Sequence, residues 1–88
     1  MSDDTFQFFS NEYAQALQAY TAIENQASTL MLLGSTDELA GFIAQFIEMA
    51  SRVRQQALDR DEPNFAEWFK ELVDKAETLR SAVANARR

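Results

Sequence analysis

Apolar residues recur along this chain in alternating steps of three and four, and three successive segments show the same pattern. The first stripe holds Phe6, Phe9, Tyr13, Ala16, Tyr20, Ile23, Ala27 and Leu30. The second holds Leu39, Ile43, Phe46, Ala50, Val53 and Ala57, and the third holds Phe65, Phe69, Leu72, Ala76, Leu79, Val83 and Ala86. Only a helix places residues at this spacing on one face, so the pattern predicts an all-α protein.

The three segments predict three helices, at roughly residues 5–33, 36–60 and 63–86. Further apolar residues beside each stripe widen it, which suits a helix that contacts two neighbours rather than one. The joints are short, so neighbouring helices are expected to run antiparallel. The 88 residues are therefore predicted to form one helical domain, residues 1–88, folded as an up-down-up antiparallel three-helix bundle. The alternative is a hairpin of two long helices that dimerises, with the third helix packed alongside.

Residues typical of helix ends occupy both joints. Gly34 can adopt the left-handed conformation that ends a helix. Ser35 and Glu38 match the S-x-x-E capping box, in which the serine hydroxyl and the glutamate carboxylate each accept a backbone N–H. At the second joint Pro63 suits the first turn of a helix, with either Glu62 or Asn64 as the residue that caps it.

The residue types that most catalytic and metal sites need are missing. The chain has no His and no Cys, which excludes a histidine base, a thiol nucleophile and a thiolate metal site. Ser35 lies about where an acyl carrier protein attaches its prosthetic arm, but it lacks that family's D-S-L motif. Glu71 and Asp74 form an E-x-x-D step similar to that of all-helical, magnesium-dependent nucleotide pyrophosphatases, but a second acidic pair is missing. The chain is predicted not to be an enzyme and to use no metal or cofactor.

Charge is distributed unevenly along the chain, whose net charge is −6. Residues 1–51 carry seven acidic and no basic side chains, whereas residues 52–88 carry seven acidic and eight basic ones. An acidic first half argues against direct binding to nucleic acid, because phosphates require a basic face. The sequence lacks the run of roughly 18 apolar residues that a membrane span needs. Its acidic start, Met1–Asp4, differs from the basic start of a signal peptide, so a cytoplasmic protein is expected.

Aromatic residues concentrate where the first and third helices are expected to begin. Both starts lie at the same end of an up-down-up bundle. Seven of the ten aromatic residues belong to this end: Phe6, Phe8, Phe9, Tyr13, Phe65, Trp68 and Phe69. Phe8 lies off the apolar stripe and Trp68 at the edge of its own. These two are therefore candidate contacts for a partner, since aromatic anchors dominate protein interfaces.

The outer face of the first helix is polar and nearly uncharged. Its residues are Gln7, Asn11, Gln15, Gln18, Thr21, Ala22, Asn25 and Ser28. Because interface cores are depleted in charge, this face is a second candidate for contact with a partner or a twin subunit. Leu32, close to the first joint, also falls on the outer face of its helix and is a further candidate contact.

These observations favour a non-catalytic, small acidic protein-interaction module, acting as an adaptor, a chaperone-like subunit or a regulatory inhibitor. The expected partner is a protein, with no direct nucleic-acid or membrane binding, and a homodimer through the first helix is compatible with this. One alternative is a self-assembling coiled-coil structural protein, in which the stripes pair between chains. Another is an acidic inhibitor of a nucleic-acid-binding protein, of the type found in phages or mobile elements.

Overall fold

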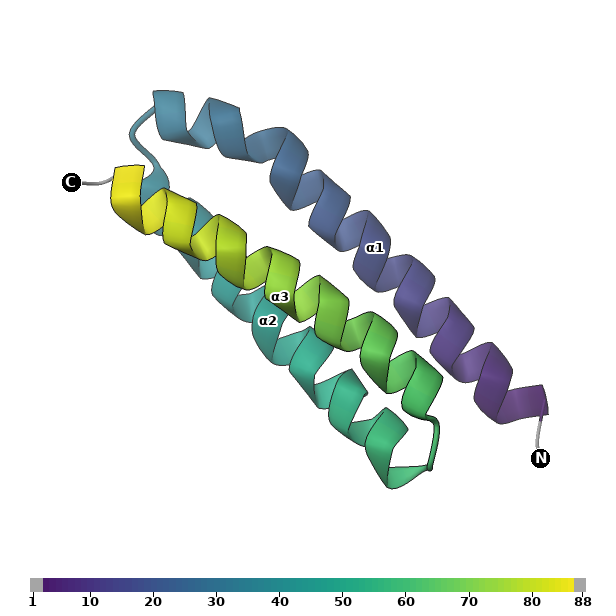
Figure 1. Ribbon diagram of the computed structural model, residues 1–88. Helices are drawn as coiled ribbons and strands as arrows, with labels where there is room; N and C mark the ends of the chain where they lie inside the picture. Colours follow the sequence, from purple (N-terminus) through teal and green to yellow (C-terminus); the bar gives the residue numbers. More distant parts are fainter. Residues whose placement is uncertain (1–2, 87–88) are drawn as a thin grey trace.

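The chain folds into three helices that run up, down and up again (Figure 1). The computed structural model describes the backbone of residues 3–86 and the side chains of residues 4–86. It contains α1 (Asp3–Leu32), α2 (Thr36–Asp59) and α3 (Pro63–Ala86), and no strand among the described residues. The bundle is elongated, at 49 × 18 × 14 Å. The prediction of an all-α three-helix bundle is confirmed, and each helix end lies within two residues of its expected position.

The apolar stripes of the three helices meet to form the core. The buried side chains of α2 are Leu39, Ile43, Phe46, Ala50, Val53 and Ala57, and those of α3 are Phe65, Ala66, Phe69, Leu72, Ala76 and Val83. The described part of α1 buries only Phe9, Ala16, Tyr20 and Ala27. Because α1 contributes four buried residues against six from each of the others, α2 and α3 form the closest pair and α1 packs more openly on them.

Both joints are Schellman motifs, in which the backbone itself satisfies the carbonyl groups at the helix end. At the first, Gly34 has a φ of 77°, its N–H donates to the Met31 carbonyl (3.2 Å), and the Ser35 N–H donates to the Leu30 carbonyl (2.8 Å). This geometry occupies the Ser35 N–H, so the Glu38 carboxylate cannot accept it. Ser35 holds the N-cap position of α2, but its side chain makes no cap hydrogen bond. The expected capping box is therefore wrong.

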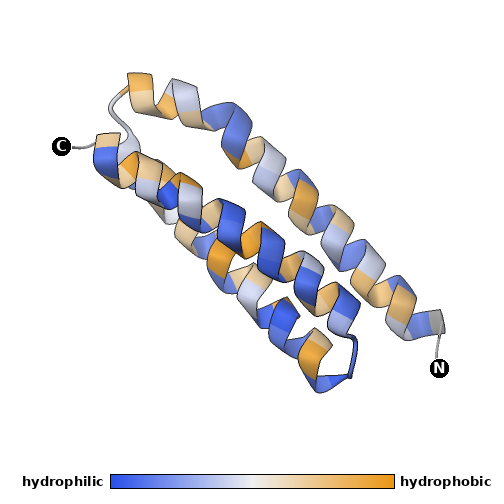
Figure 2. Ribbon diagram, in the orientation of Figure 1, coloured by the Kyte–Doolittle hydropathy of each residue, from blue (hydrophilic) through white to orange (hydrophobic). Residues whose placement is uncertain are grey.

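The second joint, which Figure 2 shows as hydrophilic, has the same hydrogen bonds with a different residue at the left-handed position. The Asp61 N–H donates to the Leu58 carbonyl (3.2 Å), and the Glu62 N–H donates to the Ala57 carbonyl (2.8 Å). The Glu62 carbonyl accepts the Ala66 N–H (3.1 Å), which makes Glu62, of the two expected residues, the one that precedes the first turn of α3.

Asp61 is expected to be a site of backbone strain, because it is a non-glycine residue with a φ of 58°. Left-handed backbone is costly for residues with a Cβ and easy for glycine. We expect Asp61→Gly to raise the free energy of unfolding by about 0.5–1 kcal/mol, measured by urea denaturation. The matched control is Asp59→Gly, inside the last turn of α2, which should lower it. A loss of stability in both variants would contradict this account of the joint.

Candidate interaction surface

The seven clustered aromatic rings form one connected network at the end of the bundle where α1 and α3 begin. Phe9 stacks on Phe65 with their centroids 5.4 Å apart. Tyr13 contacts Trp68 at 5.4 Å and Phe69 at 5.7 Å, so it joins α1 to α3. The network therefore holds α1 against α3 at this end of the bundle.

The structure places Phe8 and Trp68 in this network but not in contact with each other. Phe8 is 36% exposed, meets the Phe9 ring edge-on at 5.0 Å, and has the Arg60 guanidinium 5.3 Å from its centroid. Trp68 is 43% exposed and packs edge-on against Phe65 at 5.1 Å. Each exposed ring thus already has partners within the chain, and Phe9 and Phe65 link the two.

Phe6 lies on the apolar stripe of α1 but is largely exposed. It is 58% exposed, although its ring meets Phe65 edge-on at 5.6 Å. Phe6 lies in the first turns of α1, one turn before Phe9, where the bundle ends and offers little to cover it. Its place at the start of the stripe was the signal that could have identified it.

The outer face of α1 is exposed along its whole length. Every predicted contact on it is solvent-accessible, namely Gln7, Asn11, Gln15, Gln18 and Asn25. Apart from Leu32 at its end, this face carries no large apolar side chain, and interface hot spots are rich in large anchors. Leu32 is 88% exposed at the end of α1, and its neighbour Leu33, which was not predicted, is also exposed.

An apolar groove runs between α1 and α2, with a volume of about 380 Å³. It is lined by Ala19, Ala22, Ile23, Gln26, Phe42, Gln45, Phe46 and Met49. None of these side chains is charged, and six of the eight are apolar. The groove exists because α1 packs less closely against α2 than α3 does. The α1 side chains that line it include the small Ala19 and Ala22. Phe42, 38% exposed, forms part of its wall.

A second groove, between α1 and α3, has a volume of about 390 Å³, and its lining includes the charged side chains of Glu24 and Lys75. The Tyr20 hydroxyl in its wall donates a hydrogen bond to the Lys75 carbonyl (3.4 Å), linking the two helices. Burial raises the pKa of the Tyr20 hydroxyl, and the carboxylate of Glu24 raises it further. Tyr20 therefore stays neutral in the folded chain at a pH where the unfolded chain ionises it.

The raised pKa of Tyr20 predicts a loss of stability in alkali. Below the unfolded pKa of about 10 both states keep the proton, and above it only the folded state does, so the free energy of unfolding falls with rising pH. Urea denaturation between about pH 8 and pH 11 should show a steeper fall for the wild type than for Tyr20→Phe. Glu24→Gln should give an intermediate slope. Equal slopes for the wild type and Tyr20→Phe would contradict the assignment.

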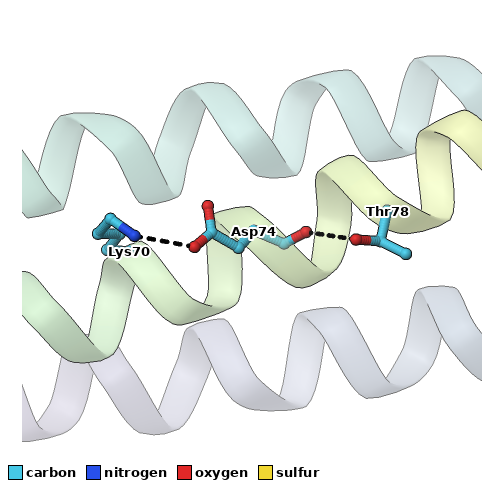
Figure 3. Close-up of polar contacts among 3 residues, drawn as sticks. All are labelled: Lys70, Asp74 and Thr78. Atoms are coloured by element: carbon cyan, nitrogen blue, oxygen red, sulfur yellow. Dashed lines mark hydrogen bonds and ion pairs between the residues drawn. The ribbon is translucent and has the colours of Figure 1, made fainter.

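Asp74, one of the two carboxylates of the E-x-x-D step on α3, is engaged within its own helix (Figure 3). The Lys70 ammonium donates to the Asp74 carboxylate (3.1 Å), a hydrogen bond that raises the pKa of Lys70. The Asp74 carbonyl accepts the Thr78 hydroxyl (3.0 Å). Over the side chains of residues 4–86, no three acidic groups gather where they could hold a metal ion. Glu71 and Asp74 are thus part of a charged outer face.

No known protein family, characterised protein or solved structure matches this chain. Of the helices described over residues 3–86, none is both long and apolar enough to cross a lipid bilayer. The surfaces of the bundle are therefore the guide to function, and the apolar groove combines concavity with large, uncharged side chains.

Proposed function

We propose that this chain is a non-catalytic protein-interaction module that binds a helical segment of another protein in the groove between α1 and α2. The observation that supports this most is the lining of the groove, which is apolar, uncharged and open to solvent. Exposed apolar surface of this kind costs free energy in water, and a docked partner recovers it. Helix-in-groove binding is a common mode of recognition for such surfaces.

The groove supports binding better than the two surfaces predicted from the sequence. At the aromatic end the rings already contact one another, and Arg60 lies over Phe8. The outer face of α1 carries mainly polar side chains and lacks a cluster of large apolar ones. These two surfaces could add contacts around a binding site. The groove offers a pocket for large side chains of a partner, and such buried anchors contribute most of the binding free energy of an interface.

The proposed role is binding without chemistry, as an adaptor, a chaperone-like subunit or a regulatory inhibitor. The absence of His and Cys from the sequence supports it, because the commonest catalytic bases and nucleophiles are lacking. A cytoplasmic location belongs to the same proposal, since small secreted domains commonly depend on disulfides and this chain has no cysteine.

Site-specific photo-crosslinking in cells tests the proposal. A photoreactive amino acid replaces Ala22, an exposed residue of α1 at the edge of the groove, or Gln15, an exposed residue of the outer face of α1 that does not line the groove. We expect the probe at Ala22 to give a defined adduct with a different protein and the probe at Gln15 to give none or a much weaker one. An adduct from Gln15 alone, or equal labelling from both positions, would show that the groove is not the binding site.

A further inference from the structure

We infer that the segment bound in the α1–α2 groove is an amphipathic helix whose apolar stripe is flanked by Lys and Arg. This inference rests on the proposed function and adds the chemistry of the partner. Two features of the described residues lead to it: the spacing of the groove-lining side chains and the sign of the charges around them.

The size of the groove matches two turns of a helix. Its walls come from residues 19–26 of α1 and residues 42–49 of α2, which run antiparallel. Each wall spans seven residue steps, or about 10 Å at the rise of an α-helix. Anchors at positions i, i+4 and i+7 of a partner helix span the same length and lie on one face. Two or three aliphatic side chains of a partner therefore fit along the groove.

The charges bordering the groove are acidic. Glu38 lies one turn before Phe42 on α2, and Glu12 lies two turns before Ala19 on α1, so each falls on the groove side of its helix. α1 contains no Lys or Arg. Arg52, one turn after Met49, is paired with Glu48 at 3.2 Å, which offsets its charge. A partner with basic flanks meets opposite charges here, and a partner with acidic flanks meets like ones.

A second copy of this chain fits the border less well. Its α1 and the first half of its α2 would bring acidic residues to an acidic border, because residues 1–51 contain no basic side chain. In its second half, Arg52, Lys70 and Arg80 are paired with carboxylates of their own helices, and seven acidic residues nearly balance the eight basic ones of residues 52–88. The charge pattern therefore favours a different protein over self-association.

Two synthetic helical peptides of about 18 residues provide the test, long enough for partial helicity in water. Both carry Leu at i, i+4, i+7 and i+11, and their flanking positions are Lys in one and Glu in the other. Fluorescence anisotropy at low and high salt measures binding, and amide chemical shifts map it. We expect the Lys peptide to bind at least about tenfold more tightly than the Glu peptide at low salt, with this preference shrinking in high salt. The shifts should centre on residues 19–26 and 42–49.

Two variants separate the charge from the groove. The double variant Glu12→Gln with Glu38→Gln should bring the two peptides to within about threefold of each other, while Phe42→Glu should remove binding of the Glu peptide and weaken that of the Lys peptide. Equal binding of both peptides to the wild type, or shifts centred elsewhere, would overturn the inference about the partner. The proposed function would still stand if Ala22 crosslinks a protein in cells, and it fails separately if Ala22 does not.

Discussion

Replacing Phe9 with alanine is expected to lower the free energy of unfolding by about 3–5 kcal/mol. The Phe9 side chain is 0% exposed, and its ring stacks on Phe65 and meets Phe8 edge-on. In the described part of α1, Phe9 and Tyr20 are the two buried aromatic residues, and removal of the Phe9 ring leaves a cavity at the end of the bundle. Small domains have only about 5–15 kcal/mol of stability, so this variant should be largely or partly unfolded at moderate temperature.

The matched control for this prediction is Phe6→Ala. Both phenylalanines lie on the same stripe and both contact Phe65, but Phe6 is 58% exposed. Its loss should cost about 1 kcal/mol or less. Urea denaturation followed by far-ultraviolet circular dichroism compares the two variants with the wild type. Similar losses at the two positions would mean that the end of α1 packs differently from the structure described here.

The second large effect is expected in binding. Phe42→Glu should weaken the affinity for the protein crosslinked through Ala22 at least about 100-fold, or about 2.7 kcal/mol. The substitution removes an apolar wall and places a carboxylate in a groove whose lining offers it no charged partner. The fold should persist, because Phe42 is partly exposed in the unbound chain. Isothermal titration calorimetry measures the affinity, and circular dichroism verifies the helical content.

Leu58→Glu is the control for Phe42→Glu. Leu58 is a similarly exposed apolar residue on the same helix, and it lies outside the groove, next to the second joint. The two variants carry the same added charge, so any general effect of charge on the affinity appears in both. If Phe42→Glu binds the partner as tightly as the wild type, or if both variants weaken binding equally, the groove is not the binding site.

The helices and their order could be predicted from the sequence because the apolar spacing is regular over three segments and the joints carry Gly34 and Pro63. The details of the helix ends could not be predicted from the sequence. The Schellman motif takes the Ser35 N–H that a capping box needs, and that choice depends on how the preceding helix ends. Phe6 matches the stripe in sequence, but the stripe does not show where the bundle stops covering it.

The groove between α1 and α2 could not be predicted from the sequence alone. Phe42 and Met49 are apolar residues beside the stripe of α2, and from the sequence they only widened a face that packs within the bundle. They line an open groove because α1 packs less closely than its stripe suggests, and the small side chains Ala19 and Ala22 face them. The distance between helices depends on the packing of all three stripes together, which a reading of one stripe at a time does not capture.

We expect one copy of the chain to complete the bundle and to leave the groove open for a different protein, and the proposed function depends on this expectation. The solution mass tests it most directly, measured by size-exclusion chromatography with light scattering over a range of protein concentrations. We expect a monomer of 10.0 kDa at every concentration. A dimer that persists on dilution would contradict it, because one copy of the chain would then not be the complete unit.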